Sequence, residues 1–176
     1  MTAVRLFWLL LCVLWIIAEI KLARKHKLAG SAVTESEHRS QRVLWLTVLA
    51  SLGAALVFKN LAWLPIAIDY LPRQGIALLV FAAGLYLRYR AVSRLGRFFT
   101  TDVLIHQEHQ LISDGPYRWL RHPAYTGLLL AFIGVGLAMG DGLALLTLTL
   151  ANFVAFKFRI TIEEAVLNKK FGSAYR

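Results

Sequence analysis

Five apolar runs separated by short polar stretches constrain this chain more than any other feature. They cover residues 4–20, 43–58, 75–89, 124–139 and 143–156. The 176-residue chain is 58% hydrophobic and 17% charged, whereas soluble domains average about 25% charged residues. The second and third runs are somewhat short against the ~20 residues that usually cross a bilayer, but the flanking Arg42, Lys59 and Arg88 can snorkel to the interface. We therefore predict an all-α polytopic membrane protein with five transmembrane helices.

The first run begins with Arg5, as a signal peptide would. It lacks a short apolar region that ends in small residues, and Glu19, Lys21 and Arg24 follow it directly. This pattern favours a retained membrane helix. Cys12, the only cysteine, lies within this run and excludes an intramolecular disulfide framework.

Two connections fix the expected order of the later spans. Residues 60–74 contain two prolines and a tryptophan, which predicts a segment at the membrane interface. Only Gly140-Asp141-Gly142 separates the last two runs, and a turn this short predicts a helical hairpin. We expect one membrane domain, with a variable part over residues 1–74 and a core over 75–176.

Basic residues outnumber acidic ones by 20 to 10, and they gather on one side of this topology. Only Arg5, Lys59 and Arg73 lie on the other side. The positive-inside rule then places the N-terminus outside, and residues 91–122 and the C-terminus in the cytoplasm. The charge of +10 also attracts anionic membrane lipids. Nucleic acid is not an expected partner, because long apolar runs separate the basic residues.

Polar side chains with chemical potential occupy two cytoplasmic stretches. One precedes the fourth run and the other follows the fifth, and together they hold Asp102, His106, Glu108, His109, His122, Glu163 and Glu164. Because the hairpin turns back within three residues, both stretches must meet at the same membrane face. We expect a site there.

In the first stretch, Gly115-Pro116 indicates a turn, and Pro123 suits the first turn of the next helix. That helix start would present free backbone N–H groups to a carboxylate or a ribose hydroxyl. The alternative is a membrane boundary with an aromatic belt that includes Tyr117 and Tyr125. Arg118 and Trp119 are assigned to that boundary.

The second stretch is expected to continue the fifth run as a cytoplasmic helix, with Arg159 and Glu163 on one face. A surface ion pair is the simpler interpretation. Adjacent carboxylates beside apolar spans are costly without partners, however, which favours a functional role for Glu163 and Glu164.

Other residues point to packing rather than chemistry. His106 and His109 lack the spacing of a zinc helix, so no metal site is expected. Asn152 within the fifth run predicts a helix-to-helix hydrogen bond, and Gly84, Gly134 and Gly136 predict close helix packing. No phosphate-binding loop or dinucleotide fingerprint is present in the sequence.

Several motifs in order resemble the isoprenylcysteine carboxyl methyltransferase family, which is grouped with the membrane phospholipid methyltransferases. The resemblance covers residues 84–175, about half of the chain. Its most characteristic part is Arg121-His122-Pro123-Ala124-Tyr125-Thr126-Gly127. The other motifs are GLYLR at 84–88, LGRFFT at 95–100, HQLI at 109–112, GPY at 115–117, Arg159, EE at 163–164, Leu167 and FGSAY at 171–175.

The resemblance implies a multi-pass membrane enzyme that uses S-adenosyl-L-methionine in a cytoplasmic pocket and releases S-adenosyl-L-homocysteine. It implies that the cofactor contacts His109, Gln110, Leu111, Ile112, Tyr117, His122, Pro123, Ala124, Tyr125 and Glu163. It also implies that Arg159 contacts a lipid-like or prenylated acceptor that enters from the bilayer.

The chemistry of the acceptor stays open. A carboxylate acceptor, which we favour, needs no general base, and Arg159 would hold it by paired N–H bonds. An amine acceptor such as a phospholipid must lose a proton, which makes His106, His109 or Glu164 a candidate base. A small hydrophobic thiol also fits. A membrane reductase that uses NADPH and a membrane scaffold without enzymatic activity are the alternatives from other classes.

Overall fold

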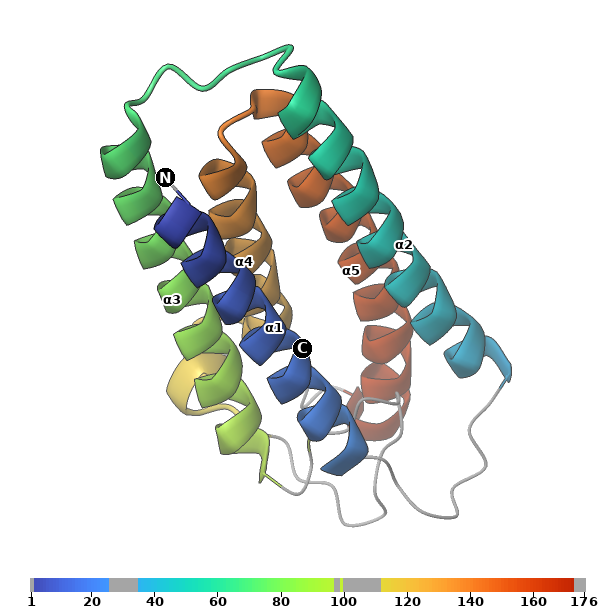
Figure 1. Cartoon of the computed structure of the whole chain (residues 1–176). Coiled ribbons are helices and arrows are strands. Elements are labelled where there is room, and N and C mark those ends of the chain that lie inside the picture. The colour runs from blue at the N-terminus through green and yellow to red at the C-terminus, as the bar shows by residue number, and fades with distance from the viewer. Residues whose placement is uncertain (1, 26–34, 97–98, 100–111, 173–176) are drawn as a thin grey trace.

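The computed structural model describes residues 2–25, 35–96, 99 and 112–172, and the regular elements of this part are all helices. Its elements are α1 (Thr2–Lys25), α2 (Glu35–Leu61), α3 (Tyr70–Leu95), the short 3-10 helix η2 (Gly115–Arg118), α4 (Pro123–Met139) and α5 (Gly142–Phe171) (Figure 1). Four of the long helices have the length and apolar composition needed to cross a membrane, and α4 is a shorter apolar helix. The predicted all-α class and the five apolar helices are confirmed.

Most helices extend beyond their apolar runs, because charged residues with good helix propensity flank the runs. As predicted, the stretch after the fifth run continues it as a helix, and both belong to α5. The segment over 60–74 that is predicted to lie at the interface is partly helical. Its first two residues belong to α2 and its last five to α3, so only residues 62–69 are irregular.

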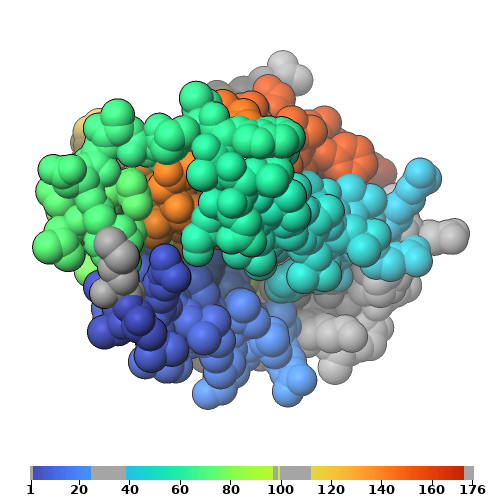
Figure 2. Space-filling view, turned by 45° about the horizontal axis from the view of Figure 1, so that its top comes forward, coloured from blue at the N-terminus to red at the C-terminus, as the bar shows by residue number. Residues whose placement is uncertain are grey.

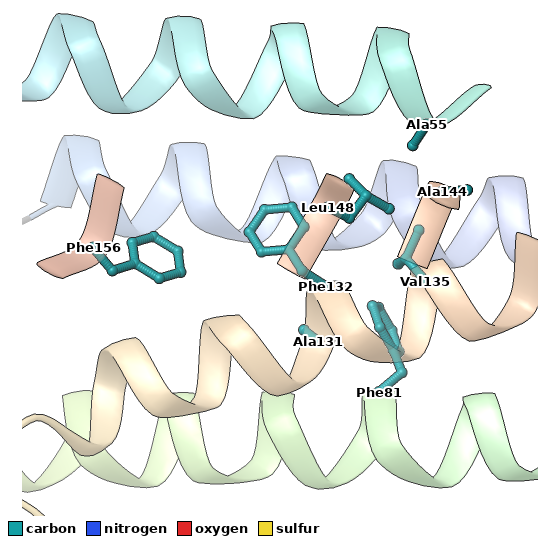
Figure 3. Close-up of a cluster of buried hydrophobic side chains, with 8 residues drawn as sticks. All are labelled: Ala55, Phe81, Ala131, Phe132, Val135, Ala144, Leu148 and Phe156. Atoms are coloured by element: carbon teal, nitrogen blue, oxygen red, sulfur yellow. The ribbon is translucent and has the colours of Figure 1, made fainter. Parts of the chain in front are cut away.

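The core lies among four helices. α3 packs against α4, α4 against α5, and α5 against α2 (Figure 1). Buried side chains from these helices form one cluster: Ala55, Phe81, Ala131, Phe132, Val135, Ala144, Leu148 and Phe156 (Figure 3). This arrangement leaves α1 as an outer helix.

Glycines allow α3 and α4 to approach closely, as predicted. A Cβ on Gly84 would lie 2.6 Å from the backbone oxygen of Gly127, and one on Gly127 would lie 2.6 Å from the backbone nitrogen of Arg88. Gly134 meets Phe81 in the same way, at 2.8 Å. Close contact at Gly84 and Gly127 brings Arg88 next to the first turns of α4.

The outer helix α1 attaches through aromatic side chains. Trp8 and Trp15 each place a ring edge against Phe81, with 5.5 Å between ring centroids. Most other large side chains of α1 are exposed and would face lipid in a membrane. Figure 2 shows α1, in blue, on the outside of the bundle.

At the end of the bundle where α3 and α5 begin, hydrogen bonds around Asp141 join two connecting segments, and we call this set of bonds the clamp. Asp141 caps α5 by accepting a hydrogen bond from the Ala144 nitrogen at 3.0 Å, and it accepts a second from the Leu64 nitrogen at 2.8 Å. Backbone bonds join Gly142 to Leu64 and Ile66 to Gly140. The irregular segment before α3 is thereby fixed to the α4–α5 turn.

Candidate functional site

The two polar stretches meet, as the short hairpin predicted. His122 is the N-cap residue of α4, Pro123 follows at the first helical position, and Glu164 lies in the second half of α5. His122 Nε2 lies 3.1 Å from Glu164 Oε1, and both side chains are partly buried. The start of α4 and the end of α5 therefore form one polar surface at the same end of the bundle.

Arg159 lies at the centre of this surface. It is only 5% exposed. Its Nε donates to the Tyr125 hydroxyl of α4 at 3.2 Å, and its Nη1 donates to the Ser40 hydroxyl of α2 at 3.1 Å. One guanidinium thus joins α2, α4 and α5. A buried arginine can bind a carboxylate or phosphate with its planar fork of donors.

Tyr117 adds an aromatic ring and Glu163 adds a carboxylate to the same end of the bundle. Burial raises the pKa of the Tyr117 hydroxyl above its ordinary value, the Glu163 carboxylate raises this pKa further, and the Arg88 guanidinium opposes the rise. The Tyr125 ring lies between His122 and Phe156, with centroids at 6.1 and 5.6 Å. The Glu163 carboxylate is therefore close enough to affect the Tyr117 hydroxyl, and Tyr125 supplies a second ring at this end of the bundle.

Arg88 does not snorkel, and that expectation is wrong. The side chain is buried because Glu19 of α1 neutralises it: Nε and Nη2 donate to the Glu19 carboxylate at 3.3 and 3.0 Å. Tyr89 and Trp15 donate to the same carboxylate at 3.3 and 3.4 Å. The Arg88 guanidinium also lies over the Phe99 ring, 5.3 Å from its centroid.

Several predicted site residues lie outside the described residues: His109, Gln110 and Leu111, together with His106, Glu108 and Asp102. Ile112 is described and partly buried, and Pro123 and Ala124 are buried in the first turn of α4. Arg118 and Trp119 are exposed and stack on each other at 5.4 Å, in keeping with a boundary role. Within the described residues no cluster of metal-binding side chains occurs.

Sequence reasoning missed Glu19, Ser40 and the role of Arg88. Glu19 is the only acid in α1, and an acid within a membrane helix is a signal of a buried partner. Ser40 carries no comparable signal, since serine is common at helix starts. Asn152 forms the predicted contact between helices, because its Nδ2 donates to the Ser51 hydroxyl of α2 at 3.0 Å.

The polar and aromatic groups of this surface favour a particular kind of ligand. A carboxylate near aromatic rings suits a cation, because the ring faces and the carboxylate are both electron-rich. The first turn of α4 offers backbone N–H groups to an anionic or hydroxyl group, and Arg159 suits a second anion. The surface therefore fits a ligand with a cationic centre and polar ends, next to an acidic second ligand.

Comparison with known proteins identifies relatives over most of this region. The profile of the "Isoprenylcysteine carboxyl methyltransferase (ICMT) family" matches residues 76–169. A "Probable protein-S-isoprenylcysteine O-methyltransferase" of Oryza sativa subsp. japonica is 34% identical over 130 residues, which cover 73% of this chain and 65% of the relative. The Schizosaccharomyces pombe "Protein-S-isoprenylcysteine O-methyltransferase" is 35% identical over 58% of this chain and 44% of its own length.

A solved structure agrees with these matches. It is titled as a eukaryotic intramembrane Ras methyltransferase ICMT, and it superposes with a TM-score of 0.56 at 28% identity. The superposition covers 82% of this chain and 50% of that chain. The chain thus spans less than two thirds of the length of these relatives.

Proposed function

The chain belongs to the isoprenylcysteine carboxyl methyltransferase family, and from this membership and the site geometry we propose that it is a membrane methyltransferase that uses S-adenosylmethionine. The proposed acceptor is the carboxylate of a prenylated cysteine or a similar amphiphile that enters from the bilayer. The observation that carries the proposal is the buried Arg159, held by hydroxyls of two other helices beside the His122–Glu164 pair.

The donor set described above fits S-adenosylmethionine. Glu163 would oppose the positive charge of the sulfonium, with the rings of Tyr117 and Tyr125 facing the same centre. Pro123 has no backbone N–H, so the backbone N–H groups of Ala124 and Tyr125 would donate to the polar ends of the cofactor. His122, fixed by Glu164, would border the same ligand. The same pocket is proposed to include His109, Gln110, Leu111 and Ile112.

When bound, the cofactor supplies a methyl group on a positively charged sulfur, which leaves as a neutral thioether. The protein's task is to align a nucleophilic oxygen with that methyl group and to exclude water. Arg159 would hold the acceptor carboxylate by two N–H bonds while Tyr125 keeps the guanidinium plane in place. A carboxylate is already deprotonated at neutral pH, so this step requires no general base.

We further propose that this site faces the cytoplasm. In the topology expected from the sequence, seventeen of the twenty basic residues fall on one side, which the positive-inside rule assigns to the cytoplasm. A lipid-tailed acceptor explains a site on membrane helices, because the tail stays in the bilayer while its polar end reaches Arg159.

The experiment is methyl transfer by the purified protein in lipid nanodiscs with tritiated S-adenosylmethionine. The acceptors are N-acetyl-S-farnesyl-L-cysteine, its carboxamide as a matched control, and a native lipid extract. Volatile tritium released by base from the first acceptor alone supports carboxyl methylation. Base-stable label in the lipid extract would instead indicate an amine or thiol acceptor, and no transfer to any acceptor would overturn the proposal.

A further inference from the structure

The buried pair of Glu19 and Arg88 is not explained by holding α1 to the bundle alone. Trp8 and Trp15 already attach α1 through apolar contacts, and a buried ion pair is often no more stabilising than apolar side chains of the same size. The side chains of Arg88 and Glu19 are only 8% and 16% exposed. Their position relative to the site offers a second role.

Arg88 borders the site from the side of α3. Its backbone contacts α4 at Gly127, two residues after Tyr125, and η2, which contains Tyr117, packs against α3. The guanidinium charge and the Glu163 carboxylate both act on Tyr117, with opposite sign. Arg88 and Arg159 are thus two buried cations beside a surface that suits a cationic ligand.

The charged groups beside this surface determine its affinity for a cation. Glu163 and Glu164 contribute two negative charges, and Arg159 contributes one positive charge. If Glu19 neutralises Arg88, the Glu163 carboxylate acts on a cationic ligand without an opposing charge from α3. Without the Glu19 carboxylate, Arg88 adds one uncompensated positive charge in a poorly solvated place, where its effect is screened less than at the surface.

We propose that Glu19 of α1 is a positioning residue that neutralises and holds Arg88, so that the site distinguishes the cationic methyl donor from its neutral product. This inference rests on the proposed function. It assigns α1, which lies outside the part of the chain matched by the family profile, an effect on cofactor affinity through Arg88. It also gives the enzyme a means of product release, because S-adenosylhomocysteine has lost the sulfonium charge that the site favours.

The test compares the affinities of S-adenosylmethionine and S-adenosylhomocysteine by isothermal titration calorimetry, without acceptor, for the full-length protein in nanodiscs. Glu19→Gln keeps an oxygen that Trp15 and Tyr89 can still reach but removes the charge. We expect it to weaken binding of the methionine form about tenfold relative to the homocysteine form, the effect of one unit charge at roughly 10 Å in a medium of intermediate dielectric constant. The double variant Glu19→Gln with Arg88→Met should restore the wild-type ratio, because it removes the uncompensated cation.

Asp114→Asn is the matched control. It removes a carboxylate from the Arg94–Asp114 ion pair, whose side chains are 53% and 55% exposed, so water screens the remaining charge. The wild-type ratio should persist in this variant. Equal weakening of both ligands by Glu19→Gln, or a ratio that the double variant fails to restore, would overturn the inference and leave the proposed function intact. Binding of neither ligand by the wild type would overturn both.

Discussion

Each end of the bundle buries one charged residue, the N-cap of α5 at one end and a residue within α5 at the other, and the two residues have different kinds of partner. At one end, the two carboxylate oxygens of Asp141 accept hydrogen bonds from the backbone N–H groups of Ala144 and Leu64. At the other end, Arg159 donates to the side-chain hydroxyls of Tyr125 and Ser40. Backbone groups need their partners in order to stay buried, whereas hydroxyls can exchange theirs for water or a ligand.

We call the end that contains Asp141 the structural end and the end that contains Arg159 the chemical end. At the Asp141 end, the segment before α3 and the α4–α5 turn are joined by short backbone bonds, which fix the relative positions of the helices. At the Arg159 end, side chains of α2, α4 and α5 meet at the Arg159 guanidinium, and the His122–Glu164 pair also joins α4 to α5. A charge buried in a membrane protein is therefore informative only when its partners are known.

The largest effect is expected from Arg159→Ala at the chemical end. Loss of the paired N–H bonds to a carboxylate should lower kcat about 100-fold or more, since charge-assisted bonds of this kind contribute about 2–4 kcal/mol. Affinity for S-adenosylhomocysteine should change by less than about threefold, because Arg159 is assigned to the acceptor. Steady-state methyl transfer and calorimetry measure the two quantities.

Lys157→Ala is the control for this variant, since it removes an exposed cation two residues earlier on α5. It should retain activity. Equal losses of turnover and cofactor affinity in Arg159→Ala would contradict a role specific to the acceptor.

At the structural end, Asp141→Ala should destabilise the fold by about 2–4 kcal/mol, because α5 loses its N-cap and two backbone N–H groups lose their acceptor. The activity of the protein that remains folded should be unchanged. Thermal unfolding in detergent, followed by circular dichroism, measures the loss. Asp69→Ala is a close control, because Asp69 occupies the N-cap position of α3 without a side-chain cap bond; a similar loss there would contradict the clamp.

Glu164→Gln tests whether the chemical end needs a base. The amide can still bond His122, so we expect a loss of turnover of no more than about tenfold, arising from the missing negative charge near the cofactor. Methyl ester formation between pH 6 and 8 measures it. A loss above about 100-fold would indicate proton transfer by Glu164 and contradict a step that needs no general base.

Tyr117→Phe should have the smallest effect, less than about threefold in cofactor affinity, because a phenylalanine ring retains the face toward the cation. The raised pKa of Tyr117 keeps its hydroxyl neutral at physiological pH, so no phenolate charge is lost. Tyr117→Ala, which removes the ring, should weaken binding about tenfold by the same calorimetric measurement. Equal effects of the two substitutions would assign the role to the hydroxyl instead.

The sequence predicts the helices well because the membrane imposes a length and a composition on each span. The three-residue turn at Asp141 predicts that the His122 and Glu164 stretches meet, and their side chains do meet at 3.1 Å. Helix ends are less predictable, since charged residues beyond the apolar run continue the helix without a change in pattern. The clearest case is α2, which begins at Glu35 although its apolar run begins at residue 43.

Contacts between distant segments could not be predicted from local pattern. Ser40 and Arg159 are 119 positions apart, and Glu19 and Arg88 are 69 apart. Their pairing depends on how α1 and α2 pack on the other helices, and nothing in an apolar run specifies which neighbour it will face. Arg88 was therefore expected at the interface, although a carboxylate on another helix makes its burial favourable.

The central claim is that the Arg159 end of the bundle performs the chemistry. It is tested most directly by a crystal structure with S-adenosylhomocysteine and N-acetyl-S-farnesyl-L-cysteine bound. Our account predicts the cysteine carboxylate within hydrogen-bond distance of the Arg159 guanidinium, and the thioether sulfur beside Glu163 and Tyr117. A carboxylate bound away from Arg159, or a cofactor bound at the Asp141 end, would contradict it.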